Sequence, residues 1–245
     1  MKPSIAITLG AGVFVVMLGA YIVSYATTVR EPVEWKSGDV IVQDSKAAEL
    51  LPLFAADGSG MTHIGVVEVS PEGAVVIEAA ERVVATPIRT FLARGKDEAF
   101  AVYRVGSLSD DQRKAVAAAA RRQLGKPNDF FLQKSWDALY SSELVRLAYS
   151  DIGVDVGEMK RLGKVAGDLS VVKSHFMRNW AANVDCGKRR FDKNQCWTMA
   201  TKQEVVTPAS IANDARMTKI YASEARTSGF TLSRAAEKKA ETPAP

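Results

Sequence analysis

Cysteine and histidine are scarce in this sequence, with two residues of each among 245. A zinc site needs three or four nitrogen, sulfur or oxygen ligands at close spacing. The two histidines, His63 and His175, lie far apart in the chain, and neither has a second ligand nearby at metal spacing. We therefore expect no metal site and no cofactor, and we interpret His175 as a structural or surface residue.

The excess of positive over negative charge is also small. The 32 lysines and arginines exceed the 28 aspartates and glutamates only slightly, which leaves a net charge of +4. This excess is too small to indicate a nucleic-acid-binding protein. The hydrophobic fraction of 47% is ordinary for a globular protein, so a chain disordered throughout is excluded.

Charged residues are absent from Ile5 to Ala26. As a helix this stretch would be about 33 Å long, enough to cross a hydrocarbon core of about 30 Å. Lys2 precedes it and favours an N-terminus on the inside. We expect residues 1–29 to be an uncleaved single-pass anchor in a bacterial inner membrane, with the domain in the periplasm. Ser24-Tyr25-Ala26 resembles a signal-peptide cleavage site, so the alternative is a secreted or periplasmic protein.

The two cysteines, Cys186 and Cys196, would close a short loop. In an exported domain such a pair predicts a disulfide, which would contribute roughly 2–3 kcal/mol to stability. Lys188-Arg189-Arg190 lies between them. We interpret this basic run as the solvent-exposed tip of a loop. The alternative is a contact for anionic glycan or lipid headgroups.

A β-hairpin is predicted between residues 63 and 79. His63 to Val69 and Ala74 to Ala79 are rich in β-branched residues with period-two alternation, and Ser70-Pro71-Glu72-Gly73 has the composition of a turn. A four-residue loop would pair Val69 with Ala74 and Val67 with Val76. The same register would place Gly65 opposite Glu78.

This register would bring His63 and Glu78 onto one face as diagonal neighbours, roughly 7–8 Å apart at Cα. Gly65 has no side chain, so the carboxylate would have room to lean toward the imidazole. A carboxylate in this position fixes the tautomer of a histidine that acts as a general base. A slip of one residue would separate the pair. The alternative is an ordinary strand histidine and a solvent-facing glutamate.

A helix is predicted to begin near Ser141, because apolar residues then recur at helical spacing, as far as Ile152. Ser141 or Ser142 would be the N-cap, with Glu143 in the first turn. The functional alternative uses the same position, since free backbone N–H groups at a helix start can bind an oxyanion. Ser109 and Gln112 form a capping-box pattern for an earlier helix. Gly153 to Lys173 is interpreted as a polar connection.

Six short motifs occur along the chain in a characteristic order. They are GDVIVQ (38–43), THIGVV (62–67), VIEA (76–79), LGKPND (124–129), YSSELV (140–145) and VVTPASIANDARMTKIY (205–221). Together they resemble the permuted papain-like amidases of the YiiX/YaeF-like group. That group is related to the NlpC-type peptidoglycan hydrolases and to lecithin–retinol acyltransferase-like proteins. The resemblance covers roughly Trp35 to Ser223.

The resemblance implies a site as well as a fold. In this family the histidine comes first, then its acidic partner, then the nucleophile. His63 would therefore be the general base, Glu78 would orient it, and Ser141 would occupy the nucleophile position. The family pattern there is Tyr-Cys-Ser-Glu-Leu, so serine replaces cysteine. A serine needs proton removal during attack, whereas a thiol can be held as a thiolate.

Three interpretations of Ser141 stay open: an engineered inactivating substitution, a natural Ser-His-Glu hydrolase, or a naturally inactive relative. A second departure is Asn128, where the family usually has an aromatic residue. We expect it to affect local packing or a pocket wall.

The expected fold class is α+β. A circularly permuted papain-like domain over residues 30–227 would have a small antiparallel sheet packed against helices. Residues 228–245 are rich in alanine, lysine, glutamate and proline, which predicts a disordered tail.

The expected activity is amide or ester hydrolysis through an acyl-enzyme, with a small-molecule, peptide or lipid substrate such as a cell-wall peptide or lipoprotein. The alternatives are a catalytically inactive, membrane-anchored binding protein and a lipid acyltransferase. The sequence leaves the oligomeric state open.

Overall fold

The computed structural model describes residues 33–46, 59–133, 135, 137–165 and 168–223. The expected anchor (1–29) and tail (228–245) lie outside these residues. The chain divides into two units, 1–34 and 35–245, and the account below concerns the second. None of the helices in the described ranges combines the length and the apolar character needed to traverse a bilayer.

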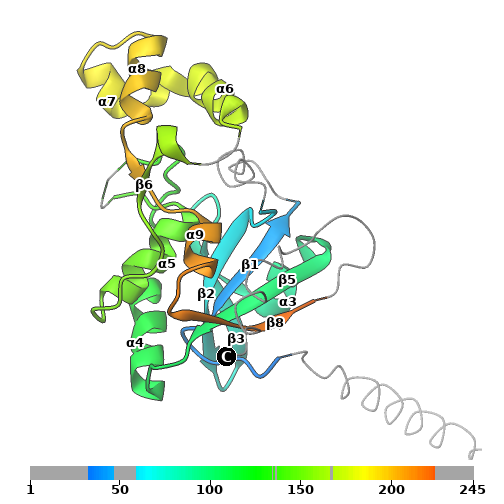
Figure 1. Cartoon of the computed structure of the whole chain (residues 1–245). Helices are drawn as coiled ribbons and strands as arrows, with labels where there is room; N and C mark the ends of the chain where they lie inside the picture. Colours follow the sequence, from blue (N-terminus) through cyan, green and yellow to red (C-terminus); the bar gives the residue numbers. More distant parts are fainter. Residues whose placement is uncertain (1–32, 47–58, 134, 136, 166–167, 224–245) are drawn as a thin grey trace, which may run out of the picture. The chain divides into compact units, whose positions relative to one another are not determined.

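The centre of the domain is a six-stranded antiparallel sheet (Figure 1). Its strands lie in the order β4-β3-β2-β1-β5-β8. Their bounds are β1 Val40–Ser45, β2 His63–Ser70, β3 Gly73–Ala79, β4 Val83–Pro87, β5 Gly95–Val105 and β8 Met217–Ala222. The last of the six motifs, 205–221, thus ends in β8, the edge strand beside β5.

The predicted hairpin register is confirmed. Val69 pairs with Ala74 and Val67 pairs with Val76 across β2 and β3. At Gly65 the two strands approach so closely that an added Cβ atom would clash with Cγ1 of Val76 and lie 2.9 Å from the carbonyl oxygen of Ile77. Only glycine fits this position without a shift of the partner strand.

Helices α4 (Asp110–Arg121) and α5 (Ser141–Ser150) pack against each other and against β2 and β3. They cover the sheet face on which Val40, Val42, Ile64, Val66 and Ile77 are fully buried. Each such side chain contributes roughly 1.5–3 kcal/mol relative to an exposed one. The predicted capping box of α4 is present, because the Ser109 side chain and Gln112 bond reciprocally.

The opposite face of the sheet carries the alternate residues of the same strands. Helix α3 (Ile88–Ala93) contacts β3, β4 and β5 and contributes the fully buried Phe91. Val67 and Val76 are buried on this side. His63, at the start of β2, and Glu78, near the end of β3, share this face.

A helical lobe is inserted between α5 and the last strand. It begins and ends at a two-stranded ribbon, β6 (Lys160–Arg161) and β7 (Glu204–Val205), in which Lys160 pairs with Val205. Between them lie η1 (Leu162–Lys164), α6 (Ser170–Asn179), η2 (Trp180–Ala182), α7 (Val184–Lys188) and α8 (Lys193–Ala200), whose colours run from light green through yellow to orange in Figure 1. The expected plain connection from Gly153 to Lys173 is therefore wrong, since it contains β6, η1 and the start of α6.

The predicted disulfide is confirmed and joins α7 to α8 within this lobe. Cys186 and Cys196 are both buried, and their Cα atoms are 5.5 Å apart. No described cysteine is free. A covalent link between two short helices restrains this part of the lobe.

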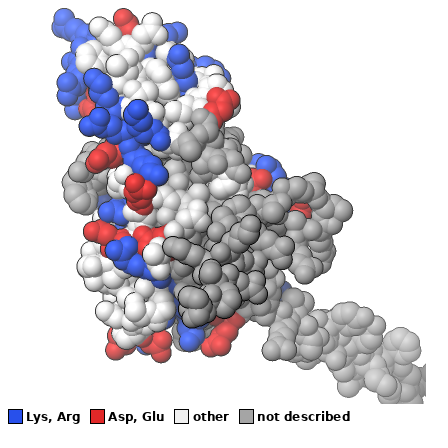
Figure 2. All heavy atoms as spheres, in the orientation of Figure 1, with Lys and Arg blue, Asp and Glu red and all other residues white. Residues whose placement is uncertain are grey.

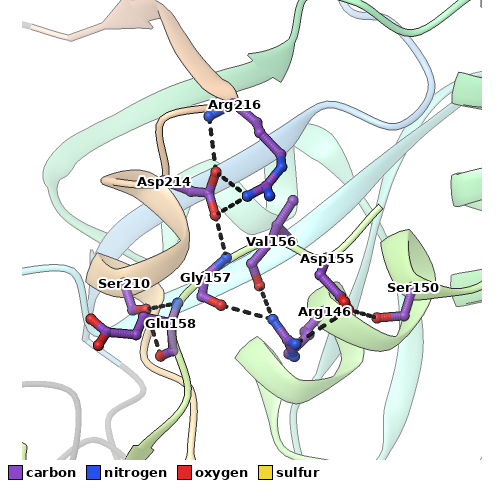
Figure 3. A network of polar contacts seen from close by, with 9 residues as sticks. All are labelled: Arg146, Ser150, Asp155, Val156, Gly157, Glu158, Ser210, Asp214 and Arg216. Atoms are coloured by element: carbon purple, nitrogen blue, oxygen red, sulfur yellow. Dashed lines mark hydrogen bonds and ion pairs between the residues drawn. The ribbon is translucent and has the colours of Figure 1, made fainter. Parts of the chain in front are cut away.

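A polar network fixes α5 to the chain that follows it and to helix α9 (Pro208–Ala212) (Figure 3). Arg146 of α5 donates hydrogen bonds of 2.7 Å to the carbonyl oxygens of Val156 and Gly157. Asp214, just after α9, accepts a hydrogen bond from the Gly157 N–H at 2.9 Å. The direction of α5, and so the position of Ser141, is set by several tertiary contacts.

Candidate active site

A buried histidine–glutamate pair lies where the hairpin register predicts it. Nε2 of His63 and Oε2 of Glu78 form a short hydrogen bond. The Glu78 side chain is fully buried, whereas the His63 side chain is 13% exposed. A buried carboxylate on one ring nitrogen orients the imidazole and leaves Nδ1 as the nitrogen that can accept a proton.

Two further residues hold the other oxygen of Glu78. Oε1 accepts a hydrogen bond of 2.5 Å from the Thr86 hydroxyl on β4 and another from Nη2 of Arg94, which follows α3. Burial by itself would raise the pKa of Glu78, but the hydrogen bonds from His63 and Thr86, with the charges of His63 and Arg94, lower the pKa below its ordinary value. The carboxylate is therefore ionised at neutral pH.

Sequence reasoning missed Thr86 and Arg94. Thr86 pairs with Val76 across β3 and β4, which puts its side chain diagonal to Glu78 on the same face. The β3–β4 register was the signal that could have found Thr86. Arg94 depends on the path of α3, which local patterns do not determine.

The imidazole is also held by aromatic contact. The rings of His63 and Phe91 are stacked, with centroids 5.6 Å apart and an interplanar angle of 26°. The guanidinium of Arg94 lies 5.4 Å from the centroid of the Phe91 ring. Phe91 thus contacts both His63 and Arg94. These two residues both bind Glu78, so the four side chains form one packed cluster.

Gln43 lies opposite His63 in the β1–β2 pairing and is fully buried. Its side-chain amide has no hydrogen-bond partner among the described residues. A buried, unsatisfied amide costs about 1–3 kcal/mol. Residues of this kind are concentrated at functional sites, so we add Gln43 to the candidate site.

Ser141 is the first residue of α5, and neither it nor Ser142 is the N-cap. Tyr140 occupies that position in an extended conformation, so the predicted capping role was wrong. The physical reason is tertiary. The Ser142 hydroxyl donates a 2.7 Å hydrogen bond to the carbonyl oxygen of Val206, and the N–H of Val206 donates to the Tyr140 hydroxyl at 3.1 Å.

The C-terminal end of α5 is tied to the start of β1. Tyr149 donates a hydrogen bond to the carbonyl oxygen of Gly38, and the N–H of Gly38 donates to the carbonyl oxygen of Val67. Ser141 is at the opposite end of this helix.

His63 and Ser141 belong to opposite faces of the sheet. His63 faces α3, whereas α5 packs on the other face. Among the described residues, no hydrogen bond joins Ser141 to His63. The Ser141 side chain is nevertheless buried, with 4% exposed.

Two buried carboxyl groups lie close to the start of α5. Burial, together with the nearby charge of Asp129, raises the pKa of Glu143 from 4.5 to about 8. Burial also raises the pKa of Asp129 to about 6, against the hydrogen bonds that it accepts from backbone N–H groups. One oxygen of each, Oδ2 and Oε2, lacks a partner among the described residues. Near neutral pH the two carboxyl groups are therefore not both ionised.

Asn128 has the packing role that the sequence suggested. Its amide donates to the carbonyl oxygens of Ala79 and Ala80, at the end of β3. His175 also matches its expected structural role, since it is half-buried on α6 and stacks on Phe130 at a centroid distance of 6.4 Å.

The antiparallel sheet, the flanking helices and the order of histidine, acid and helix start define a permuted papain-like fold. The chain belongs to the permuted papain-like amidase family YaeF/YiiX (C92), whose profile matches residues 34–221.

Two relatives agree with this assignment. The uncharacterized protein YiiX of Escherichia coli strain K12 is 30% identical over 151 residues, which cover 61% of this chain and 75% of YiiX. The crystal structure described as metalloprotein YiiX from Escherichia coli O157:H7 matches with a TM-score of 0.64 and 28% identity. That match covers 77% of this chain and 97% of the solved one.

Proposed function

We propose that this protein is a hydrolase of amide or ester bonds that works through Ser141, His63 and Glu78. The observation that carries the proposal is the fully buried Glu78 carboxylate bonded to Nε2 of His63. Burying an ionised group is costly unless several partners compensate it, and three partners do so here. A structure that maintains this arrangement around an imidazole that is 13% exposed keeps an oriented base within reach of solvent.

In the proposed mechanism, Oγ of Ser141 attacks the substrate carbonyl carbon while Nδ1 of His63 takes the hydroxyl proton. Backbone N–H groups at the start of α5 stabilise the oxyanion. Collapse of the tetrahedral intermediate expels the leaving amine or alcohol, which receives the proton from His63. A water molecule, activated by the same nitrogen, then hydrolyses the acyl-enzyme.

In this mechanism the rate of acylation depends on the reactivity of the Ser141 hydroxyl. We propose that it stands where the family has cysteine, because Tyr140 to Leu144 otherwise match the family pattern. A serine depends on close contact with the base, and no hydrogen bond to His63 is present in the described residues. This absence favours a second candidate function, a binding protein that keeps the cleft without the chemistry. A lipid acyltransferase would use the same triad with another acceptor.

The relative from Escherichia coli O157:H7 is described as a metalloprotein. Among residues 33–46, 59–133, 135, 137–165 and 168–223, no group of three or more histidine, cysteine, aspartate or glutamate side chains is arranged to hold a metal ion. The described residues of this chain do not fit a metal site, and the proposed mechanism includes no metal step.

We further propose that residues 1–29 anchor the domain, residues 30–227, to the bacterial inner membrane, with residues 228–245 as a tail. The domain would then face the periplasm, and its substrates would be cell-wall peptides, lipoproteins or lipids. Cleavage after Ala26 would release it as a periplasmic or secreted protein. The support is the absence of charge from Ile5 to Ala26.

Intact mass spectrometry after treatment with a fluorophosphonate tests the activity. The parent chain is compared with His63→Ala and with Ser141→Cys, the latter also treated with iodoacetamide. An adduct on Ser141 that is lost in His63→Ala supports a serine hydrolase. Labelling of the Ser141→Cys form alone means that the site is competent and serine is the inactivating change. No selective labelling of either form would contradict the hydrolase proposal and favour the binding protein.

A further inference from the structure

The helical lobe, residues 160–203, carries a net positive charge that exceeds that of the whole chain. It contains ten lysines and arginines and three aspartates, so it carries +7 while the rest of the chain carries −3. All ten basic side chains are exposed: Lys160, Arg161, Lys164, Lys173, Arg178, Lys188, Arg189, Arg190, Lys193 and Lys202. The net charge of the whole protein, +4, does not reveal this separation of charge between the lobe and the rest of the chain.

The basic residues of the lobe differ from those of the sheet in how they are paired. Among the described residues of the lobe, only Lys160 forms an ion pair, with Glu158. Around the sheet, nine lysines and arginines pair with carboxylates: Arg94, Lys96, Arg104, Arg113, Lys114, Arg121, Arg122, Arg146 and Arg216. The lobe therefore presents uncompensated positive charge, which an anionic surface would neutralise.

Figure 2 shows these basic side chains gathered over α6, α7 and α8, with few acidic atoms among them on the face in view. Lys188, Arg189 and Arg190 lie between the two half-cystines, so the disulfide restrains the most basic stretch. Asn183 caps α7 by accepting a hydrogen bond from the N–H of Cys186. The charges are thus carried on a preformed structure, and little ordering would be needed on binding.

Exposed apolar side chains accompany the charge. Val171 in the first turn of α6 is 50% exposed, and Val184 in the first turn of α7 is 59% exposed. These are the two highest values among the exposed large hydrophobic residues of the described part of the chain. A soluble polyanion would give a valine no favourable contact, whereas the headgroup–acyl boundary of a bilayer accepts apolar side chains flanked by lysine and arginine.

We propose that this lobe is a docking surface for a membrane rich in anionic phospholipids. The inference does not depend on the proposed hydrolase activity, because it uses no residue of the His63–Glu78 site. Docking through the lobe would give the domain a second point of contact with the bilayer and so a defined orientation.

The test places a reporter in the lobe of the full-length protein. A Val184→Trp variant is reconstituted into vesicles that contain brominated phosphatidylglycerol or, separately, brominated phosphatidylcholine. Tryptophan fluorescence is corrected with the parent chain. We expect quenching in the anionic vesicles at 0.1 M salt and its loss near 1 M salt, because the screening length falls from about 10 Å to about 3 Å.

Charge reversal in the lobe is compared with matched reversal elsewhere. Each basic residue near an anionic surface strengthens association about five-fold, so Lys188→Glu, Arg189→Glu and Arg190→Glu together should weaken lobe docking on the order of a hundred-fold. The control protein carries Lys46→Glu, Lys114→Glu and Lys219→Glu. These substitutions change the net charge equally but lie outside the lobe, and they should leave quenching unchanged.

Three outcomes would overturn the proposal. They are equal quenching by both lipids, an equal loss of quenching in the two charge-reversed proteins, and binding of a soluble polyanion such as heparin with no quenching by brominated phosphatidylglycerol. Fluorophosphonate labelling of the same variants is scored separately, so a failure of docking is distinguishable from a failure of the hydrolase proposal.

Discussion

His63 donates to a carboxylate, Glu78, that has no solvent exposure and is held from its other side by Thr86 and Arg94. The imidazole is therefore attached to a carboxylate near the end of β3 that is fixed by a residue of β4 and by the residue after α3. Among the described residues, the other ring nitrogen, Nδ1, forms no hydrogen bond, and the His63 side chain is 13% exposed. This asymmetry is what a general base requires, namely one nitrogen fixed and the other available.

Replacing Glu78 by glutamine should reduce activity more than it reduces stability. The amide keeps the size of the carboxylate but no longer stabilises an imidazolium, and comparable changes lower turnover by about 10³–10⁴-fold. The measurement is the rate of fluorophosphonate labelling of Ser141, or of iodoacetamide labelling in a Ser141→Cys background.

The matched control for Glu78→Gln is Thr86→Val, which removes one hydrogen bond to the same carboxylate and leaves its charge. A labelling rate that falls equally in both variants would mean that Glu78 acts through packing and not through its charge.

Gly65→Ala should destabilise the fold. The added methyl group would meet Val76 and the carbonyl oxygen of Ile77 in the partner strand, and overpacking of this kind costs about 1–3 kcal/mol. Urea unfolding measures the change in the free energy of unfolding. Gly106→Ala is the control, because a Cβ atom there has no neighbour within 4 Å. Equal midpoints for the two variants would contradict the close approach of β2 and β3.

Glu143→Gln should flatten the dependence of stability on pH. The folded state raises the pKa of Glu143 from 4.5 to about 8, so the folded protein binds the proton more tightly than the unfolded chain does. The resulting stabilisation is fully present below pH 4.5 and is lost as the pH rises through about 8, at up to about 1.4 kcal/mol per pH unit.

Urea midpoints between pH 5 and pH 9 provide the measurement for Glu143. The parent chain should lose stability across this range more steeply than the variant. Parallel curves would show that the carboxyl group is not protonated in the folded state. Asp214→Asn serves as a control, since the pKa of Asp214 is lowered, chiefly by hydrogen bonds from the N–H groups of Arg216 and Gly157 that outweigh its burial.

Reducing the disulfide should loosen the lobe and leave the sheet intact. Closing a loop of this size contributes roughly 2–3 kcal/mol, and Cys186 and Cys196 are joined within the lobe alone. Hydrogen exchange should therefore increase in residues 170–200 of a Cys186→Ala, Cys196→Ala variant, with the protection of β2 and β3 unchanged. A loss of protection throughout the sheet would show that the lobe supports the core.

The parts of the fold that follow from neighbouring residues were predicted from the sequence. The hairpin register depends on a four-residue turn and on the alternation around Gly65, and both are local signals. The Ser109 capping box and the Cys186–Cys196 pair are local as well. The approach of His63 to Glu78 follows from that register.

The remaining parts depend on contacts that the sequence does not display. Ser142 was assigned as a possible cap, yet its hydroxyl bonds to Val206, far along the chain. Arg94 reaches Glu78 only because α3 folds back over the sheet. The unpaired charge of the lobe becomes visible only when each basic side chain is compared with its surroundings.

The ribbon formed by β6 and β7 brings the two ends of the lobe together. Because Lys160 pairs with Val205, the chain leaves the domain and returns to it at positions about 5 Å apart. A tight turn of two residues spans that gap, so the sheet does not need the lobe for its own continuity. The length and the surface charge of this segment could therefore change without altering the strand order of the sheet.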